Sequence, residues 1–150
     1  MILPDGFCVT WQKMRKYETF STSADMGIRF KGGDFRELYE NALRGLNVLL
    51  FGANLRGTAG CAAVPFRFHG DGPENVLVNF LAAVLSLVYQ QRKRVAAIRF
   101  GQAGRSFLDA KLLVIPCRRS PKIEIKSVTY HNLRLVEAGG LMRAAIVFDV

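Results

Sequence analysis

The chain has 150 residues, and half of them are hydrophobic, so one domain can bury a core without metal or disulfide staples. Three widely separated cysteines, with no Cys-x-x-Cys pair, exclude a disulfide framework and a structural zinc site, and we expect a cytoplasmic protein. The net charge of +9 favours an anionic partner such as RNA, although solubility alone is an alternative explanation. We expect no membrane association, because the apolar run 76–89 is too short for a span and the N-terminus lacks the form of a signal peptide.

The first half of the chain contains one predicted strand and one predicted helix. Residues 1–16 are interpreted as an N-terminal extension or an edge strand, the latter because of residues 7–11, and Met14 offers an alternative start. Residues 26–31 alternate in polarity and predict a strand. Asp34 predicts the start of a helix, because Glu37 follows three residues later as in a capping box. Apolar residues then recur at three- and four-residue spacing as far as Leu49.

The middle of the chain predicts a second helix among strands. Residues 64–69 form a short strand, and Pro73 suits the first turn of a helix that continues through the apolar run to Tyr89. The cations within 90–94 suit the C-terminal end of that helix. Residues 95–100 and 106–115 predict two more strands.

The last stretch predicts a hairpin. Residues 122–135 and 141–150 form its strands, and Gly139-Gly140 permits the positive φ of a tight turn. With such a turn, Asp149 lies opposite a residue between Val128 and Tyr130, and Lys126 is a near neighbour. Strand-rich sequence with two inserted helices and no regular βαβ alternation predicts an α+β fold, a two-layer sandwich of a mainly antiparallel sheet with two principal helices.

Few residues suggest catalysis. There is no nucleophile elbow and no pair of carboxylates in an acid–base context, so we do not predict an enzyme. A metal-dependent hydrolase of phosphate esters is an alternative for which no general base is evident. Five cations are candidates for weak, electrostatic RNA contact: Arg92, Lys93, Arg94, Arg118 and Arg119.

Two motifs near the ends of the chain resemble the archease family. Residues 17–27 (YETFSTSADMG) are followed by an acidic, apolar helical segment, and residues 124–131 (EIKSVTYH) precede the closing 147–150 (VFDV). The resemblance covers residues 17–150, in the family's order, and implies a single archease-like domain over that range. Two positions depart from the family pattern: Thr22 stands in place of a His, and Ala83 in place of a Glu on the second helix.

The resemblance implies a metal site. Archeases bind a divalent cation through residues that match Asp25, Asp149 and the α-carboxylate of Val150. Ligands with oxygen donors alone suit a hard cation such as Ca²⁺, Mg²⁺ or Mn²⁺. Lys126 matches a family lysine that functions beside these carboxylates, either by neutralising their charge or by facing the partner's substrate.

The resemblance also implies a function. Archeases assist the RNA ligase that joins 2′,3′-cyclic phosphate and 5′-hydroxyl ends in tRNA splicing, by promoting guanylylation of the ligase and its turnover. On this hypothesis the protein is an activator and not itself the ligase. The alternative is a basic RNA-binding or chaperone-like module that kept the fold but lost ligase activation.

Overall fold

The structure is a computed structural model that describes residues 15–150. The edge strand expected at residues 7–11 therefore lies outside the described residues. In chain order the elements are β1 (Tyr17–Ser21), β2 (Met26–Gly32), α1 (Phe35–Phe51), β3 (Ala62–His69), α2 (Pro73–Gln91), β4 (Lys93–Ala103), β5 (Phe107–Pro116), β6 (Ser127–Val128), β7 (Val136–Ala138) and β8 (Leu141–Asp149). Strand β1, which the sequence analysis did not predict, carries the start of the first motif.

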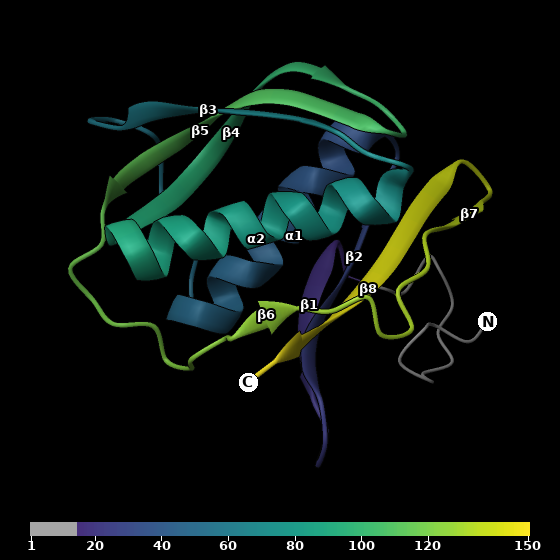
Figure 1. Cartoon of the computed structure of the whole chain (residues 1–150), viewed down its shortest axis with the longest axis horizontal. Helices are drawn as coiled ribbons and strands as arrows, with labels where there is room; N and C mark the ends of the chain where they lie inside the picture. Colours follow the sequence, from purple (N-terminus) through teal and green to yellow (C-terminus); the bar gives the residue numbers. More distant parts are fainter. Residues whose placement is uncertain (1–14) are drawn as a thin grey trace.

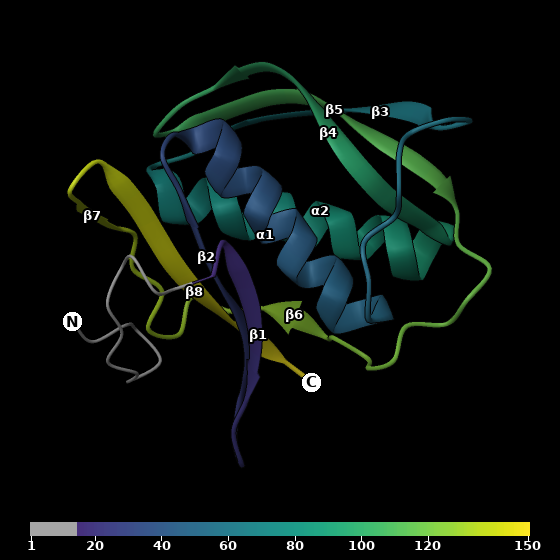
Figure 2. The ribbon, with the colours of Figure 1, turned by 180° about the vertical axis from the view of Figure 1, so that it is seen from behind.

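The strands form two antiparallel sheets with the helices between them. One sheet has the order β1-β2-β8-β6, with β7 also paired to β8, and the other has the order β3-β5-β4. Figures 1 and 2, which view the molecule from opposite sides, show α1 and α2 lying between the two sheets. The predicted α+β class, with antiparallel pairing and two principal helices, is confirmed. The sequence did not reveal that the strands are divided between two sheets.

One hydrophobic core joins both sheets to both helices. Helix α1 contributes a buried face at the predicted spacing, and the apolar run of α2 is buried beside it; the fully buried side chains include Leu38, Leu46, Leu50, Leu77, Phe80 and Leu81. Burial of each such side chain stabilises the fold by about 1.5–3 kcal/mol. The alternate residues of β8 face the same core at Ala144, Ile146 and Phe148. This core fixes β8, and with it Asp149, relative to α2.

Local sequence signals set the helix ends. The carboxylate of Asp34 accepts a hydrogen bond from the Glu37 N–H at 2.8 Å, which confirms the predicted start of α1. Helix α1 ends at Gly52, whose left-handed backbone (φ 82°) lets its N–H donate to the Val48 carbonyl. Helix α2 begins at Pro73 as predicted.

The cations expected at the C-terminal end of α2 lie at its C-cap and just beyond it. The helix ends at Gln91, and Arg92 adopts the left-handed conformation (φ 53°) with its N–H donating to the Leu87 carbonyl. The chain reverses there, so Lys93 and Arg94 are the first residues of β4. They pair with Pro116 and Ile115 of β5.

The final hairpin forms in part. Gly139 and Gly140 both have positive φ and connect β7 to β8, as predicted. The preceding strand is interrupted, because seven residues (129–135) lie opposite only four residues of β8 (144–147). Some of the extra residues form a turn in which the Leu133 N–H donates to the Tyr130 carbonyl. As a result Asp149 lies opposite Ser127, and the expected partner between Val128 and Tyr130 was wrong.

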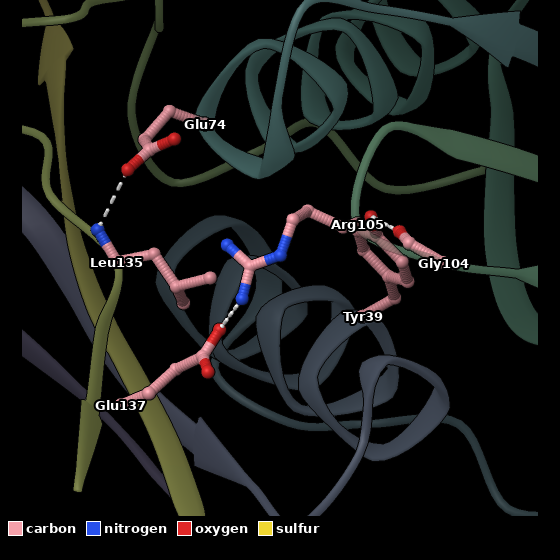
Figure 3. A network of polar contacts seen from close by, with 6 residues as sticks. All are labelled: Tyr39, Glu74, Gly104, Arg105, Leu135 and Glu137. Carbon is pink, nitrogen blue, oxygen red and sulfur yellow. Dashed lines mark hydrogen bonds and ion pairs between the residues drawn. The ribbon is translucent and has the colours of Figure 1, made fainter.

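Side chains tie this irregular segment to the rest of the molecule. Figure 3 shows Arg105, in the turn between β4 and β5, forming an ion pair with Glu137 of β7, so that the two sheets are linked. Glu74, in the first turn of α2, accepts a hydrogen bond from the Leu135 N–H at 3.1 Å. These contacts tie Leu135 to the start of α2 and Glu137 to the turn between β4 and β5.

Candidate functional site

The loop that carries Asp25 is closed by Thr22. The Thr22 hydroxyl accepts hydrogen bonds from the N–H groups of Asp25 (2.9 Å) and Ala24 (3.3 Å). The Thr22 N–H donates to the Asp25 carbonyl at 2.8 Å. Both backbone polar groups of Asp25 are therefore bonded to one residue, and the position of Asp25 at the start of β2 is defined.

Gly27 sets how closely β2 approaches β8. A Cβ atom at this position would lie 2.1 Å from the carbonyl oxygen of Ile146 and 2.7 Å from the Phe20 ring. Neither the β8 backbone nor the buried ring leaves room for a side chain. The close packing of β2 on β8 therefore requires glycine at position 27, two residues after Asp25.

The sheet register brings the two motif aspartates to the same end of neighbouring strands. Met26 of β2 is paired with Phe148 of β8, and this is the last registered pair at this end. Asp25 and Asp149 are the next residues on their strands, although 123 residues separate them in the sequence. Within residues 15–150 neither side chain forms an ion pair or hydrogen bond, so both carboxylates are available to a ligand.

Among the described residues there is no cluster of three or more His, Cys, Asp or Glu side chains that could hold a metal. The set implied by the resemblance contains only two side-chain carboxylates and, as its third member, the α-carboxylate of Val150. Asp149 and Val150 are exposed, and Asp25 is half-buried. Figures 1 and 2 show this end of the chain beside β6 and β1.

Lys126 lies beside this end of the sheet and lines a groove. Its N–H donates to the Asp149 carbonyl at 2.7 Å, so the expected proximity of the two residues holds for the backbone. Their side chains do not form an ion pair in the part of the chain that the structure describes. The groove has a volume of about 690 Å³ and runs between α2, at Ala82 and Ser86, and residues 124–128.

Tyr89 of α2 fixes the wall of the groove that carries Lys126. Its hydroxyl donates to the Ile123 carbonyl and accepts from the Ile125 N–H, both at 2.9 Å. Burial raises the pKa of Tyr89, the hydrogen bond from Ile125 opposes that rise, and the charge of Glu124 adds to it. The hydroxyl therefore stays neutral and able to donate at physiological pH. Sequence analysis missed this residue, which appeared only as the end of an apolar run.

The family comparison gives a direct result. Residues 17–150 match the model of the archease protein family (MTH1598/TM1083). The chain belongs to the archease family. The protein archease of Pyrococcus furiosus is 27% identical over 151 residues, covering 91% of this chain and 100% of the relative. The protein archease of Thermococcus kodakarensis is 26% identical over 129 residues, covering 81% and 89% respectively.

Solved structures agree with this fold. Protein 1598 of Methanobacterium thermoautotrophicum, a solution structure, is 21% identical with a TM-score of 0.64 and covers 91% of this chain and 100% of that one. The Thermotoga maritima archease, described as a possible chaperone, is 20% identical with a TM-score of 0.55 over 91% and 98% of the two chains. At these identities the likeness concerns the archease fold alone. No helix within residues 15–150 is long and apolar enough to cross a membrane.

The two positions at which the sequence is expected to depart from the archease motifs lie close to the candidate site. Thr22, in place of the histidine, supplies the hydroxyl that closes the Asp25 loop. Ala83, in place of the glutamate, is half-buried on α2, and its neighbour Ala82 lines the groove. The α2 side of the groove therefore carries no charged side chain opposite Lys126 and Glu124.

The cations considered for RNA contact gather elsewhere. Arg92, Arg94, Arg118 and Arg119 line two adjoining pockets where β4 begins and β5 ends, whereas Lys93 lines neither. The Cys117 N–H donates to the Arg92 carbonyl at 2.7 Å, which holds the two chain segments together. Arg94 is buried, a property that its place in a run of cations did not indicate.

Proposed function

We propose that this archease-family protein is an accessory protein of the RNA ligase that joins 2′,3′-cyclic phosphate and 5′-hydroxyl ends, and that it promotes guanylylation and turnover of that ligase. The observation that carries the proposal is the placement of Asp25 and Asp149 at one end of adjacent strands, with Lys126 beside them. Family membership supplies the class of partner. The accessory role, rather than catalysis, likewise rests on family membership.

The proposal includes a divalent cation held by Asp25, Asp149 and the α-carboxylate of Val150. The donor set fits a hard cation, because it consists of oxygen atoms and the two aspartates are unpaired within residues 15–150. Three carboxylates at one site would repel each other, and a bound cation neutralises that charge and can orient an anionic group of the partner. The half-burial of Asp25 and the exposure of Asp149 leave the site open to a large partner.

Lys126 has the position of a residue that faces the partner. It is exposed, lines the groove, and has no acidic partner within the described residues. Tyr89 fixes the chain just before it. A lysine with these properties is suited to meet a phosphate of the ligase's guanylate or RNA, since its ammonium group acts as a mobile point charge.

The direct test combines the protein with its cognate ligase, GTP and RNA that carries the two kinds of end. We expect the wild type to raise both ligase guanylylation and the number of turnovers. Asp149→Asn should abolish the stimulation, and Lys126→Ala should reduce it while cation binding is retained. Two variants are matched controls: Asp71→Asn changes an exposed aspartate next to α2, and Lys111→Ala changes an exposed lysine of β5.

The outcome also separates the alternatives. Stimulation that is unchanged in both Asp149→Asn and Lys126→Ala would contradict the assignment of the site. A wild type that binds RNA but never stimulates the ligase would favour a basic RNA-binding or chaperone-like module. Release of products from phosphate esters without ligase would favour a metal-dependent hydrolase.

A further inference from the structure

A second candidate site lies where β4 begins and β5 ends. Two pockets of about 380 and 220 Å³ adjoin there, because residues 117–119 line both. The larger pocket adds Arg94 and an apolar wall that includes Phe51, Leu55 and Ile115. The smaller one adds Arg92 and the side of α2 at Tyr89, which also lines the Lys126 groove.

Arg94 is a buried cation whose hydrogen-bonding capacity is only partly used. Its residue surface is 9% exposed, and its guanidinium lies 4.3 Å above the centre of the Phe51 ring. One terminal nitrogen donates to the Ala53 carbonyl, just beyond the C-terminal end of α1. The buried Nε has no hydrogen-bond partner in the structure. A buried donor without a partner is costly, so an acceptor is expected at this position when the site is in use.

The charge of this site is not balanced. No Asp or Glu lines either pocket, whereas Arg92, Arg118 and Arg119 are exposed around the buried guanidinium. Burial lowers the pKa of Arg94; the nearby Cys117 opposes this shift, and the like charge of Arg119 adds to it. Because an arginine side chain remains protonated at physiological pH, the charge must be compensated from outside.

We propose that this pocket, centred on Arg94 and flanked by Arg92, Arg118 and Arg119, binds a phosphate ester. Arginine presents several N–H donors in a planar fork that matches phosphate oxygens, and such contacts are the stronger, charge-assisted kind. The apolar wall formed by Leu55 and Ile115 suits the body of a nucleoside attached to that phosphate. A free nucleotide and an RNA strand carry the same group, and the experiment distinguishes them.

Cys117 provides a direct readout, because its half-exposed thiol lines both pockets. Alkylation of Cys117 would be followed by peptide-resolved mass spectrometry at constant ionic strength, with a chelator present so that the metal site plays no part. Cys61, also half-exposed but in neither pocket, is an internal control. The ligands are inorganic phosphate, guanosine monophosphate, a five-nucleotide RNA and guanosine without phosphate.

We expect the phosphate-bearing ligands to slow alkylation of Cys117 but not of Cys61, and guanosine to have no effect. If guanosine monophosphate protects as well as the RNA, the pocket is a site for a free nucleotide. If the RNA protects more strongly, the pocket is a site for an RNA strand. The double variant Arg118→Gln/Arg119→Gln changes two exposed side chains and should weaken protection by about tenfold or more, since each ~1.4 kcal/mol lost is tenfold in affinity. Arg99→Gln/Arg134→Gln, with the same change of charge on exposed residues outside both pockets, should behave as the wild type.

Three results would overturn the proposal: no protection by any phosphate at millimolar concentration, equal protection by guanosine, or undiminished protection in the Arg118/Arg119 variant. Arg94→Lys adds a further test, because it keeps the charge but removes the planar fork, and we expect weaker protection from a folded protein. Asp149→Asn should retain full protection. Failure of ligase stimulation and failure of phosphate binding are therefore separate results.

Discussion

The Thr22 hydroxyl accepts a hydrogen bond from the Asp25 N–H at 2.9 Å, while the Thr22 N–H donates to the Asp25 carbonyl. The resemblance assigns Thr22 to the position of an archease histidine, and in this structure its hydroxyl shapes the loop. Removal of the hydroxyl leaves the N–H groups of Ala24 and Asp25 without this acceptor, in a loop that water can reach. The role of this residue is therefore one of positioning.

We expect Thr22→Val to lower the free energy of unfolding by about 0.5–1.5 kcal/mol, the usual net value of a hydrogen bond. Thr22→Val should also weaken cation binding, because Asp25 loses its fixed position. Thr22→Ser keeps the hydroxyl and should keep the stability and the cation affinity of the wild type. Denaturant titration measures the first effect and calorimetric titration with Ca²⁺ the second. Equal cation affinity in Thr22→Val and wild type would show that the loop bonds do not position Asp25.

A second prediction concerns Gly27. Gly27→Ala should lower the free energy of unfolding by about 1–3 kcal/mol, the typical cost of forcing extra atoms into a packed site. The reason is that the new Cβ meets the Ile146 carbonyl and the Phe20 ring. Gly33→Ala is a matched control, since its Cβ would find only the Glu37 carboxylate at 3.6 Å. If Gly27→Ala is as stable as the wild type, β2 and β8 can move apart at this point without a loss of folding free energy.

The features that sequence predicted well are those set by neighbours in the chain. Asp34 and Glu37 identify a helix start because the cap bonds span three residues, and Gly139-Gly140 identifies a turn because few other residues adopt positive φ. The partner of Asp149 could not be predicted in this way. It depends on how many residues leave the sheet between β6 and β7, and nothing in the local pattern of residues 129–135 fixes that number.

The candidate sites show the same division. The resemblance selected Asp25 and Asp149, and the register places them together. The bonds of Thr22 lie within the first motif, whereas Tyr89 belongs to neither motif and bonds to Ile123 and Ile125 across more than 30 residues of sequence. Arg94 was selected by charge alone. Its burial follows from packing on Phe51 at the far end of α1, a long-range contact that periodicity does not encode.

A third prediction concerns Tyr89. Tyr89→Phe removes the hydroxyl that bonds both Ile123 and Ile125, and we expect it to lower the free energy of unfolding by about 1–3 kcal/mol because two polar groups lose a partner. Ligase stimulation should fall further than cation binding, since the change loosens the chain before Lys126. Tyr130→Phe, which removes an exposed hydroxyl bonded only to Asn75, is the control. If Tyr89→Phe stimulates the ligase as well as the wild type does, the groove beside Lys126 plays no part in stimulation.

The fourth prediction is a loss of stability in alkaline solution. Burial raises the pKa of Tyr39 above its ordinary value of about 10. Below that value both the folded and the unfolded chain keep the proton, so stability does not depend on this group. Above it the unfolded chain releases the proton first, and the free energy of unfolding falls as the pH rises. Urea titrations should show a shallower decline in Tyr39→Phe, and an identical decline would rule out Tyr39 as the cause.

The last prediction tests the cation through stability. If Asp25, Asp149 and the Val150 carboxylate hold a cation, Ca²⁺, Mg²⁺ or Mn²⁺ at ~100 times its Kd stabilises the fold by about 2.7 kcal/mol through linkage. For a domain of this size that corresponds to a rise in Tm of about 5–10 °C. Asp25→Asn and Asp149→Asn should each abolish the rise while they remain folded without metal, because removing a carboxylate also removes repulsion. Asp71→Asn should show the full rise.

The third ligand of this set requires a different probe, because the Val150 carboxylate belongs to the main chain. A C-terminal amide removes its charge without altering any side chain, and we expect the amidated protein to lose most of the cation-dependent rise in Tm. A rise of equal size in the amidated and unmodified proteins would leave Asp25 and Asp149 as ligands and exclude Val150. If none of the three cations at millimolar concentration raises the Tm of the unmodified protein, no such site exists and Lys126 with its groove must act without a metal.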